Sequence, residues 1–192
     1  MVIGVIPARL KSTRFPNKIL TPINDKPMVM HVYERSKESE KLDDVIIAID
    51  SKETEDALKQ YKPNIKMTHP DHLSGTDRVA EVIKDMDADI ILNIQGDEPM
   101  LDPLIINQLV DCFDDELVDM ATIGSTVINN SDYLNPNSVK VTINENGFAS
   151  SFCRDINDHQ IGGYYHHVGI YGYRKNTLQH LTNLDQSINE KS

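Results

Sequence analysis

Three short apolar runs, separated by segments with helical periodicity, constrain the fold of this chain more than any other feature. The runs are residues 2–6, 45–49 and 89–93. The segments between them carry apolar residues three and four positions apart, as amphipathic helices do. Strands that alternate with helices are typical of α/β proteins. The sequence therefore predicts an α/β fold, with a mixed sheet and helices on both of its faces.

The alternation ends after about residue 118, and the remainder of the chain is richer in predicted strands. Helices are predicted over about 27–39 and 51–61, from 74 and from 102, with a short strand at 65–68. Later strands are predicted at 120–128, 139–143, 148–153 and 168–173, with a hairpin turn at 144–147. We expect a single domain over 1–192, with an α/β half over about 1–118 and a small β-rich subregion over about 119–192.

The charge of the chain excludes several classes of partner. The formal net charge is −11, which disfavours binding to nucleic acid and to anionic membranes. No apolar stretch approaches the roughly 20 residues of a membrane-spanning helix, and the first residues enter a strand rather than a signal peptide. Cys112 and Cys153 form no motif, which is typical of a reduced compartment. The sequence therefore predicts a cytoplasmic protein with neither a nucleic acid nor a membrane as partner.

A carboxylate follows the third apolar run. Ile94, Gln95, Gly96 and Asp97 come directly after it, and open α/β sheets bind their ligands at the carboxyl ends of their strands. The oxygens of Asp97 suit Mg²⁺ that is carried on a nucleotide phosphate. The alternative is a simple turn that ends the strand, because Gly-Asp-x-Pro is ordinary turn chemistry. Asp97 is therefore the candidate metal ligand.

A cluster of cations follows the first apolar run. Arg9, Lys11, Arg14 and Lys18 lie in one loop of a chain that is acidic overall. Because an acidic protein repels polyanions, a local cationic loop fits a small anionic ligand such as a triphosphate. Arginine offers paired hydrogen bonds to phosphate oxygens, and lysine supplies a compact charge. The alternative is a basic loop that is simply solvated.

A third chemical segment opens the helix predicted from residue 74. Ser74 and Asp77 have the spacing of a capping box, and a small residue there lets a ligand approach the backbone at the helix N-terminus. Arg78 in the first turn opposes the helix dipole, which favours an anion nearby. His69 and His72 raise the alternative of a zinc site, which the lack of a third ligand in the sequence disfavours.

These segments together resemble a known enzyme family. The strings IPARLKSTRFPNK (6–18), MTHPDHLSGTDRVAEV (67–82) and NIQGDEP (93–99) are similar to motifs of the sugar-acid cytidylyltransferases. The resemblance is to the 3-deoxy-manno-octulosonate cytidylyltransferases, or CMP-Kdo synthetases, where Kdo is the sugar acid. Further landmarks follow in the same order, so that the resemblance covers nearly the whole chain, at residues 26–35, 135–141 and 167–174.

The resemblance implies a nucleotide-diphospho-sugar transferase-like, or Rossmann-like, fold and a Mg²⁺-dependent enzyme that is a homodimer. In such enzymes the anomeric hydroxyl of Kdo attacks the α-phosphorus of CTP, which gives CMP-Kdo and pyrophosphate for lipopolysaccharide biosynthesis. Residues of about 1–118 would bind the nucleotide, and those of about 119–192 would serve sugar binding and dimerisation. Two alternatives stay open: a related sugar acid, such as 8-amino-Kdo or a sialic acid, and an inactive nucleotide-binding fragment.

The resemblance also implies a role for each matching residue. Arg9, Lys18 and Asp97 would be catalytic, and Asp97 would bind the metal. The residues that would bind the nucleotide are Ala8, Arg9, Ser12, Thr13, Lys18, Ser74, Gly75, Arg78 and Gln95. Those that would face the sugar acid are Arg14, Arg154, His167 and Tyr171. For His167 the alternative is a histidine of the core, and for Arg154 a surface cation.

Several positions depart from the family pattern, and two of these departures bear on the candidate site. Asn17 stands where the family usually has glycine, and asparagine tolerates left-handed backbone angles well enough to keep the turn. Residues 187–192 resemble the start of a motif that the family continues into a helix, a strand and a second metal-binding aspartate. The sequence ends before that aspartate. We therefore expect that Mg²⁺ in this chain would be held by Asp97 together with phosphates and water.

Overall fold

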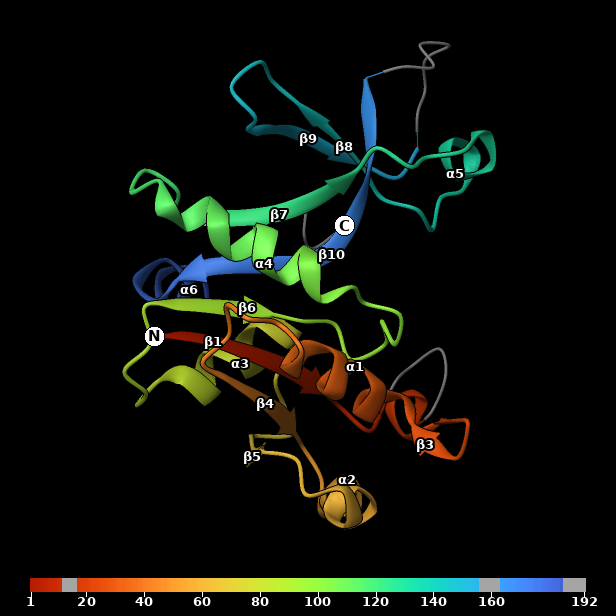
Figure 1. Cartoon of the computed structure of the whole chain (residues 1–192), viewed down its shortest axis with the longest axis vertical. Helices are drawn as coiled ribbons and strands as arrows, with labels where there is room; N and C mark the ends of the chain where they lie inside the picture. The colour runs from red at the N-terminus through yellow and green to blue at the C-terminus, as the bar shows by residue number, and fades with distance from the viewer. Residues whose placement is uncertain (12–16, 156–162, 185–192) are drawn as a thin grey trace. The chain divides into compact units, whose positions relative to one another are not determined.

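The structure is a computed structural model that describes residues 1–11, 17–155 and 163–184. The chain divides into two compact units (Figure 1). The first comprises Met1–Ala121 and Tyr171–Ser192, and the second comprises Thr122–Ile170. The single domain that the sequence predicts for the whole chain stays a prediction. The predicted motif at 187–192 lies outside the described residues.

The first unit is built on a sheet whose strands follow the order β5, β4, β1, β6 and β10. Strand β1 pairs in parallel with β4 and β6, β4 pairs in parallel with β5, and the end of β10 runs antiparallel to β6. This mixed sheet confirms the predicted fold class. The strands are β1 (Val2–Ala8), β4 (Asp44–Ile49), β5 (Ile65–Met67), β6 (Ile90–Asn93) and β10 (Tyr164–Arg174), of which residues 171–174 belong to the first unit.

Helices cover both faces of this sheet, as predicted (Figure 1). Tyr173 of β10 packs in one buried cluster with residues of helices α3 and α6. Side chains alternate along a strand, so Gly172 faces the other side of the sheet. A Cβ added there would meet Leu109 of α4 and Phe113, which follows that helix. The helices of this unit are α1 (Met28–Lys37), α2 (Lys52–Leu58), α3 (Gly75–Ile83), α4 (Pro103–Asp111) and α6 (Lys175–Leu181).

Short elements complete the first unit. A small hairpin joins β2 (Pro22–Ile23) to β3 (Lys26–Pro27), and Asn24 and Asp25 turn it with positive φ angles of 47° and 63°. The single-turn 3-10 helices are η1 (Lys18–Leu20), η2 (Lys59–Tyr61) and η3 (Cys112–Asp114). None of these was predicted as a separate element.

Three helices begin where the sequence predicts. The Ser74 hydroxyl accepts from the backbone N–H of Asp77, whose carboxylate accepts from the backbone N–H of Ser74, so the capping box is confirmed. Ser51 caps α2 through the N–H of Thr54. Asp102 caps α4, with proline in its first turn. Side-chain caps at fixed spacing therefore set these boundaries.

The second unit consists mainly of antiparallel strands. Strands β8 (Lys140–Ile143) and β9 (Ala149–Cys153) form the predicted hairpin, and Gly147 in its turn has a φ of +83°. Strand β8 also pairs with β10, as does β7 (Met120–Ser125). Two expectations need correction: β10 begins four residues before the predicted residue 168, and a short helix, α5 (Asn130–Leu134), follows β7.

No helix in the described part of the chain is long and apolar enough to cross a membrane. The longest of them, α1, has 10 residues, whereas a bilayer core needs about 20.

Candidate active site

The three chemical segments meet at the carboxyl edge of the sheet of the first unit. Because β1 and β6 are parallel, the loop after β1 and the turn after β6 leave the sheet on the same side. A Cβ added to Gly96 would lie 3.2 Å from the carbonyl oxygen of Pro7, and one added to Gly75 would lie 3.2 Å from Cγ of Pro7. Pro7, near the end of β1, therefore lies against both other segments. Each of them has a glycine at this point, which leaves room for Pro7.

A cavity of 310 Å³ opens at this junction. Five of the residues predicted to bind the nucleotide line it, and they come from all three segments: Arg9, Ser74, Gly75, Arg78 and Gln95. Pro7, His72 and Leu73 complete its wall. Residues of the three segments therefore line one cavity within the first unit, whereas Lys18 and Asp97 are not among its lining residues.

Ala8 offers only its backbone. Its side chain is completely buried, and the residue pairs with Ile49 of β4 as the last residue of β1. Ser12, Thr13 and Arg14, which the sequence predicts to bind the triphosphate and the sugar, lie outside the described residues.

Lys18 and Asp97 form an ion pair. The Nζ of Lys18 lies 2.5 Å from Oδ2 of Asp97, and the two side chains are 41% and 39% exposed. Asn17 makes this possible, because it takes the left-handed conformation with φ 59° and its N–H donates to the carbonyl of Leu10 at 3.2 Å. The tolerance of Asn17 for this turn is confirmed. The turn brings Lys18, the first residue of η1, to the carboxyl end of β6.

Arg78 lies inside the protein. Its side chain is only 2% exposed, and its guanidinium donates to the hydroxyl of Thr68 and, at 3.4 Å, to Oδ2 of Asp50. Burial lowers the pKa of the Arg78 guanidinium, and the cation of Arg9 adds to this, whereas Asp50 and Glu81 oppose it. The position of Arg78 in the first turn of α3 predicts an anion nearby. Asp50 of the same chain is such an anion.

Asp50 was not among the predicted site residues. It follows β4 directly, its side chain is 11% exposed, and its Oδ1 accepts from the backbone N–H of Leu10 at 3.0 Å. One signal could have identified it: a carboxylate at the carboxyl end of a strand adjacent to β1 must lie beside the cationic loop.

Glu81 of α3 holds the loop that precedes the helix. Its carboxylate accepts from the backbone N–H of His69 at 2.9 Å and contacts Nε2 of His72. Burial alone would raise the pKa of Glu81, but the hydrogen bonds from His72 and His69 lower it overall. The His72 ring is therefore engaged by a carboxylate at the wall of the cavity.

The predicted sugar-facing residues have separate surroundings. His167, 9% exposed, lies with Nε2 3.0 Å from Oγ1 of Thr122, and burial lowers its pKa. Arg154 is exposed and donates to the carbonyl of Pro136 at 3.3 Å. Tyr171 belongs to the first unit, stacks on Tyr173 with ring centres 6.3 Å apart, and has a pKa raised by burial.

Lys140 is a further residue that the sequence did not single out. Its side chain is completely buried, and Nζ donates to the carbonyls of Asn135 at 2.8 Å and Arg154 at 2.6 Å. It therefore fixes the backbone of Arg154 within the second unit.

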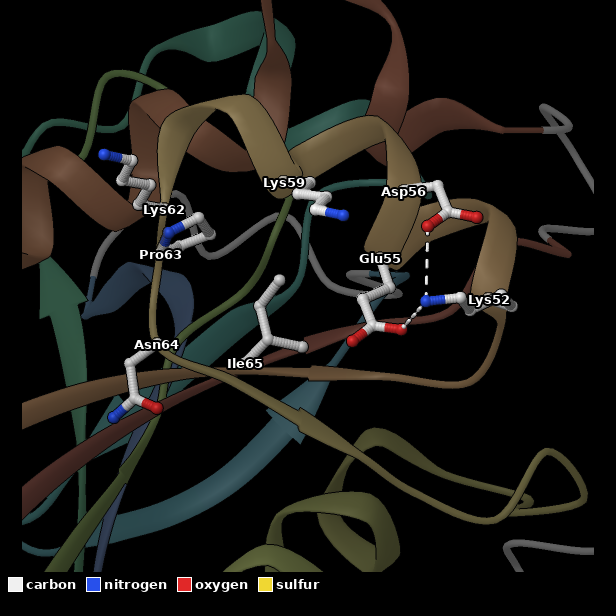
Figure 2. A pocket seen from close by; sticks show the side chains of 8 residues that line it. All are labelled: Lys52, Glu55, Asp56, Lys59, Lys62, Pro63, Asn64 and Ile65. Carbon is white, nitrogen blue, oxygen red and sulfur yellow. Dashed lines mark hydrogen bonds and ion pairs between the residues drawn. The ribbon is translucent and has the colours of Figure 1, made fainter.

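A second hollow of 470 Å³ lies along α2, η2 and β5, and Figure 2 shows its lining. Lys52 there is paired with Glu55 at 2.6 Å and with Asp56 at 3.2 Å, as the dashed lines mark. Its charges are mixed, and none of the predicted site residues lines it. The cavity beside Pro7 is therefore the candidate active site.

Comparison with known proteins shows the family of this chain. A model of the protein family described as Cytidylyltransferase matches residues 3–191. The chain belongs to the cytidylyltransferase family. The family resemblance inferred from the three motifs is thereby confirmed.

Individual members of the family are similar over most of their length. The 3-deoxy-manno-octulosonate cytidylyltransferase of Trichlorobacter lovleyi is 38% identical, over 100% of this chain and 82% of the relative. An 8-amino-3,8-dideoxy-manno-octulosonate cytidylyltransferase of a Shewanella species is also 38% identical, over 93% of this chain and 76% of the relative. A solved structure of CMP:2-keto-3-deoxy-manno-octonic acid synthetase complexed with CTP has a TM-score of 0.92 at 38% identity, and the match covers 99% of this chain and 80% of that one.

Proposed function

We propose that this chain transfers CMP from CTP to Kdo and releases pyrophosphate. The observation that carries the proposal is the cavity beside Pro7, which collects Arg9, Ser74, Gly75 and Gln95 from three separate segments. Similarity to the Trichlorobacter lovleyi enzyme, whose name specifies Kdo, supports the choice of acceptor.

The cavity suits a nucleotide for reasons of charge and shape. Arg9 is exposed and offers its guanidinium to phosphate oxygens. Gly75, in the first turn of α3, leaves the backbone open to close approach at the positive end of the helix dipole. Gln95 and the backbone of Ala8 would hold the cytidine part, since amide and peptide groups can donate and accept hydrogen bonds to a base.

We propose Mg²⁺ as the cofactor, with Asp97 as its ligand from the protein. The residue fits, because its carboxylate is 39% exposed at the carboxyl end of β6 and already holds a cation, Lys18. Mg²⁺ in proteins usually keeps several waters and is also bound by substrate phosphates, so Asp97 would hold the ion together with the phosphates of CTP and water. When bound, the ion would neutralise charge on the phosphates.

The residues of the chain would act mainly by position and charge. The anomeric hydroxyl of the sugar acid would attack the α-phosphorus and lose its proton to solvent, while the bond from the α-phosphorus to the bridging oxygen breaks and pyrophosphate leaves. Arg9 and Lys18 would stabilise the negative charge that grows on the leaving pyrophosphate. Ser12 and Thr13 would bind the triphosphate, and Arg14, Arg154, His167 and Tyr171 would face the sugar acid.

A second candidate acceptor is 8-amino-Kdo. The Shewanella relative that is named for this sugar has the same 38% identity as the Trichlorobacter lovleyi relative. Sialic acid is a third acceptor to compare. We further propose that the protein acts as a cytoplasmic homodimer in lipopolysaccharide biosynthesis.

The proposal is tested by measuring pyrophosphate with the full chain, CTP, Mg²⁺ and each sugar acid in turn. We expect rapid release with Kdo and none without a sugar. A faster reaction with 8-amino-Kdo would move the assignment to that acceptor. Binding of CTP without pyrophosphate from any of the sugars would identify a nucleotide-binding protein that lacks turnover.

A further inference from the structure

We propose that Asp50 is a positioning residue that holds the two walls of the nucleotide cavity together, and that Arg78 acts with it rather than as a ligand of CTP. This inference rests on the proposed function. Asp50 uses both oxygens at once: Oδ1 accepts from the N–H of Leu10 at 3.0 Å and Oδ2 from the Arg78 guanidinium at 3.4 Å.

The two partners of Asp50 belong to different walls of the cavity. Leu10 directly follows Arg9, so its backbone fixes where the cationic loop leaves β1. Arg78 lies in the first turn of α3, whose first residues, Ser74 and Gly75, form the facing wall. One carboxylate thus sets the spacing between the loop and the helix N-terminus.

Arg78 is fastened at a second point. Its guanidinium also donates to the Thr68 hydroxyl, and that hydroxyl donates to the carbonyl of Ile49 at 2.8 Å. Ile49 is the last residue of β4 and precedes Asp50. A side chain that is 2% exposed and hydrogen-bonded through both Nη1 and Nη2 has little freedom to reach a ligand. Its buried charge needs the carboxylate, because an unpaired charge in the interior is costly.

The charges around the cavity give Asp50 a second effect. Arg9 and Arg78 both line the cavity, so their positive charges repel one another. Burial is the main cause of the lowered pKa of Arg78, and the charge of Arg9 lowers it further. Asp50 offsets this repulsion on the buried side. The exposed Arg9 is then available to the nucleotide, while Arg78 stays in the scaffold.

A double-mutant cycle tests the pairing in the full chain. Asp50→Ala and Arg78→Met should each raise the KM for CTP about tenfold, with kcat at saturating CTP changed by no more than about twofold. If the two residues act as one unit, the double variant should also lose about tenfold rather than about a hundredfold. A higher KM with an unchanged kcat indicates that the nucleotide is positioned less well, whereas a loss of folded enzyme would lower the apparent kcat.

Asp111→Ala is the matched control. Asp111 also pairs with a cation of the first unit, Lys41, at 2.6 Å, but the pair is about half exposed and lines neither of the cavities described above. The KM for CTP should not change in this variant. Asp50→Asn keeps an acceptor for the Leu10 N–H and removes only the charge, so it serves where Asp50→Ala fails to fold. We expect a rise of about threefold in KM for this variant.

Two results would overturn the inference. The first is an unchanged or lower KM in folded Asp50→Ala or Asp50→Asn while Arg78→Met raises it, which would make Arg78 a direct ligand. The second is an additive, hundredfold loss in the double variant. Calorimetric titration of CTP without sugar gives the same comparison as Kd. A chain that binds CTP but transfers nothing would therefore refute the proposed function and still test the role of Asp50.

Discussion

Lys18→Met should strengthen metal binding to the chain in the absence of nucleotide, although it removes a residue that the proposed reaction needs. The reason is the ion pair at the carboxyl end of β6, where Nζ of Lys18 lies 2.5 Å from Oδ2 of Asp97. A metal ion that binds Asp97 must displace this ammonium or share the carboxylate with it. If the proposed site binds Mg²⁺, Lys18 would therefore compete with the metal until the triphosphate gives the lysine another partner.

The size of the effect follows from exposure and charge. An ion pair whose side chains are 41% and 39% exposed is worth about 0.2–1 kcal/mol. A metal ion that binds Asp97 must break this pair in the unchanged chain but not in the variant. Repulsion between a dication and an ammonium about 4 Å away adds up to about 2 kcal/mol in water, before screening by salt. A net gain of about 1–2 kcal/mol corresponds to a Kd for the metal that is about five- to thirtyfold lower.

Mn²⁺ can replace Mg²⁺ in the assay, because free Mn²⁺ is measured directly by electron paramagnetic resonance. Lys26→Met is the matched control, since Lys26 pairs with Glu34 at the same distance of 2.5 Å and with similar exposure. The Kd for Mn²⁺ should fall in Lys18→Met, stay unchanged in Lys26→Met and rise strongly in Asp97→Asn. An unchanged or weaker affinity in Lys18→Met would refute the competition between lysine and metal.

Three further outcomes are expected. Asp97→Asn should abolish most pyrophosphate release while the free energy of unfolding falls by no more than about 1 kcal/mol, since only an exposed ion pair is lost; an active, Mg²⁺-dependent variant would refute the metal assignment. Gly172→Ala should destabilise the protein by about 1–3 kcal/mol in urea unfolding, because its Cβ would lie 2.6 Å from Cε2 of the buried Phe113; an unchanged midpoint would contradict this packing. Burial raises the pKa of Tyr173 to about 12, so the native state keeps the phenol neutral while the unfolded chain ionises above about pH 10. Stability should therefore fall by about 1 kcal/mol between pH 9 and 11, and this part of the loss should be missing in Tyr173→Phe.

Local rules were sufficient to predict the parts of the site that depend on neighbouring residues. The capping box of Ser74 and Asp77 depends on spacing alone, and the structure contains it. The left-handed turn at Asn17 depends on the tolerance of one side chain. Asp97 lies at the carboxyl end of β6 because an apolar run defines the strand and a turn must end it. Each inference needed only a short stretch of sequence.

The missed features depend on contacts between distant segments. The partners of Arg78 within the chain were not predicted: they are Thr68 and Asp50, 10 and 28 residues away in sequence. In the sequence, Lys140 looks like an ordinary lysine of a strand. In the structure its ammonium is buried and donates to the carbonyls of Asn135 and Arg154, and the latter is 14 residues away in sequence. A single sequence shows which residues could carry charge, whereas the partner that neutralises a buried charge is set by the sheet order.

Short elements were missed for a different reason. Helix α5 has five residues, which is too few for a helical period to be recognised. Strand β10 runs for eleven residues because its two ends have different partners, β8 and β6. Its first four residues, at 164–167, carry tyrosine and histidine, and the predicted strand began only at Val168.

The most direct test of the proposed reaction follows one oxygen atom. Kdo labelled with ¹⁸O at its anomeric hydroxyl is incubated with CTP, Mg²⁺ and the full chain, and the products are read by ³¹P nuclear magnetic resonance and mass spectrometry. We predict that the label bridges sugar and phosphorus in CMP-Kdo and that the pyrophosphate carries none. An unlabelled bridging oxygen in CMP-Kdo, or CTP that stays intact although it binds, would contradict attack of the sugar oxygen on the α-phosphorus.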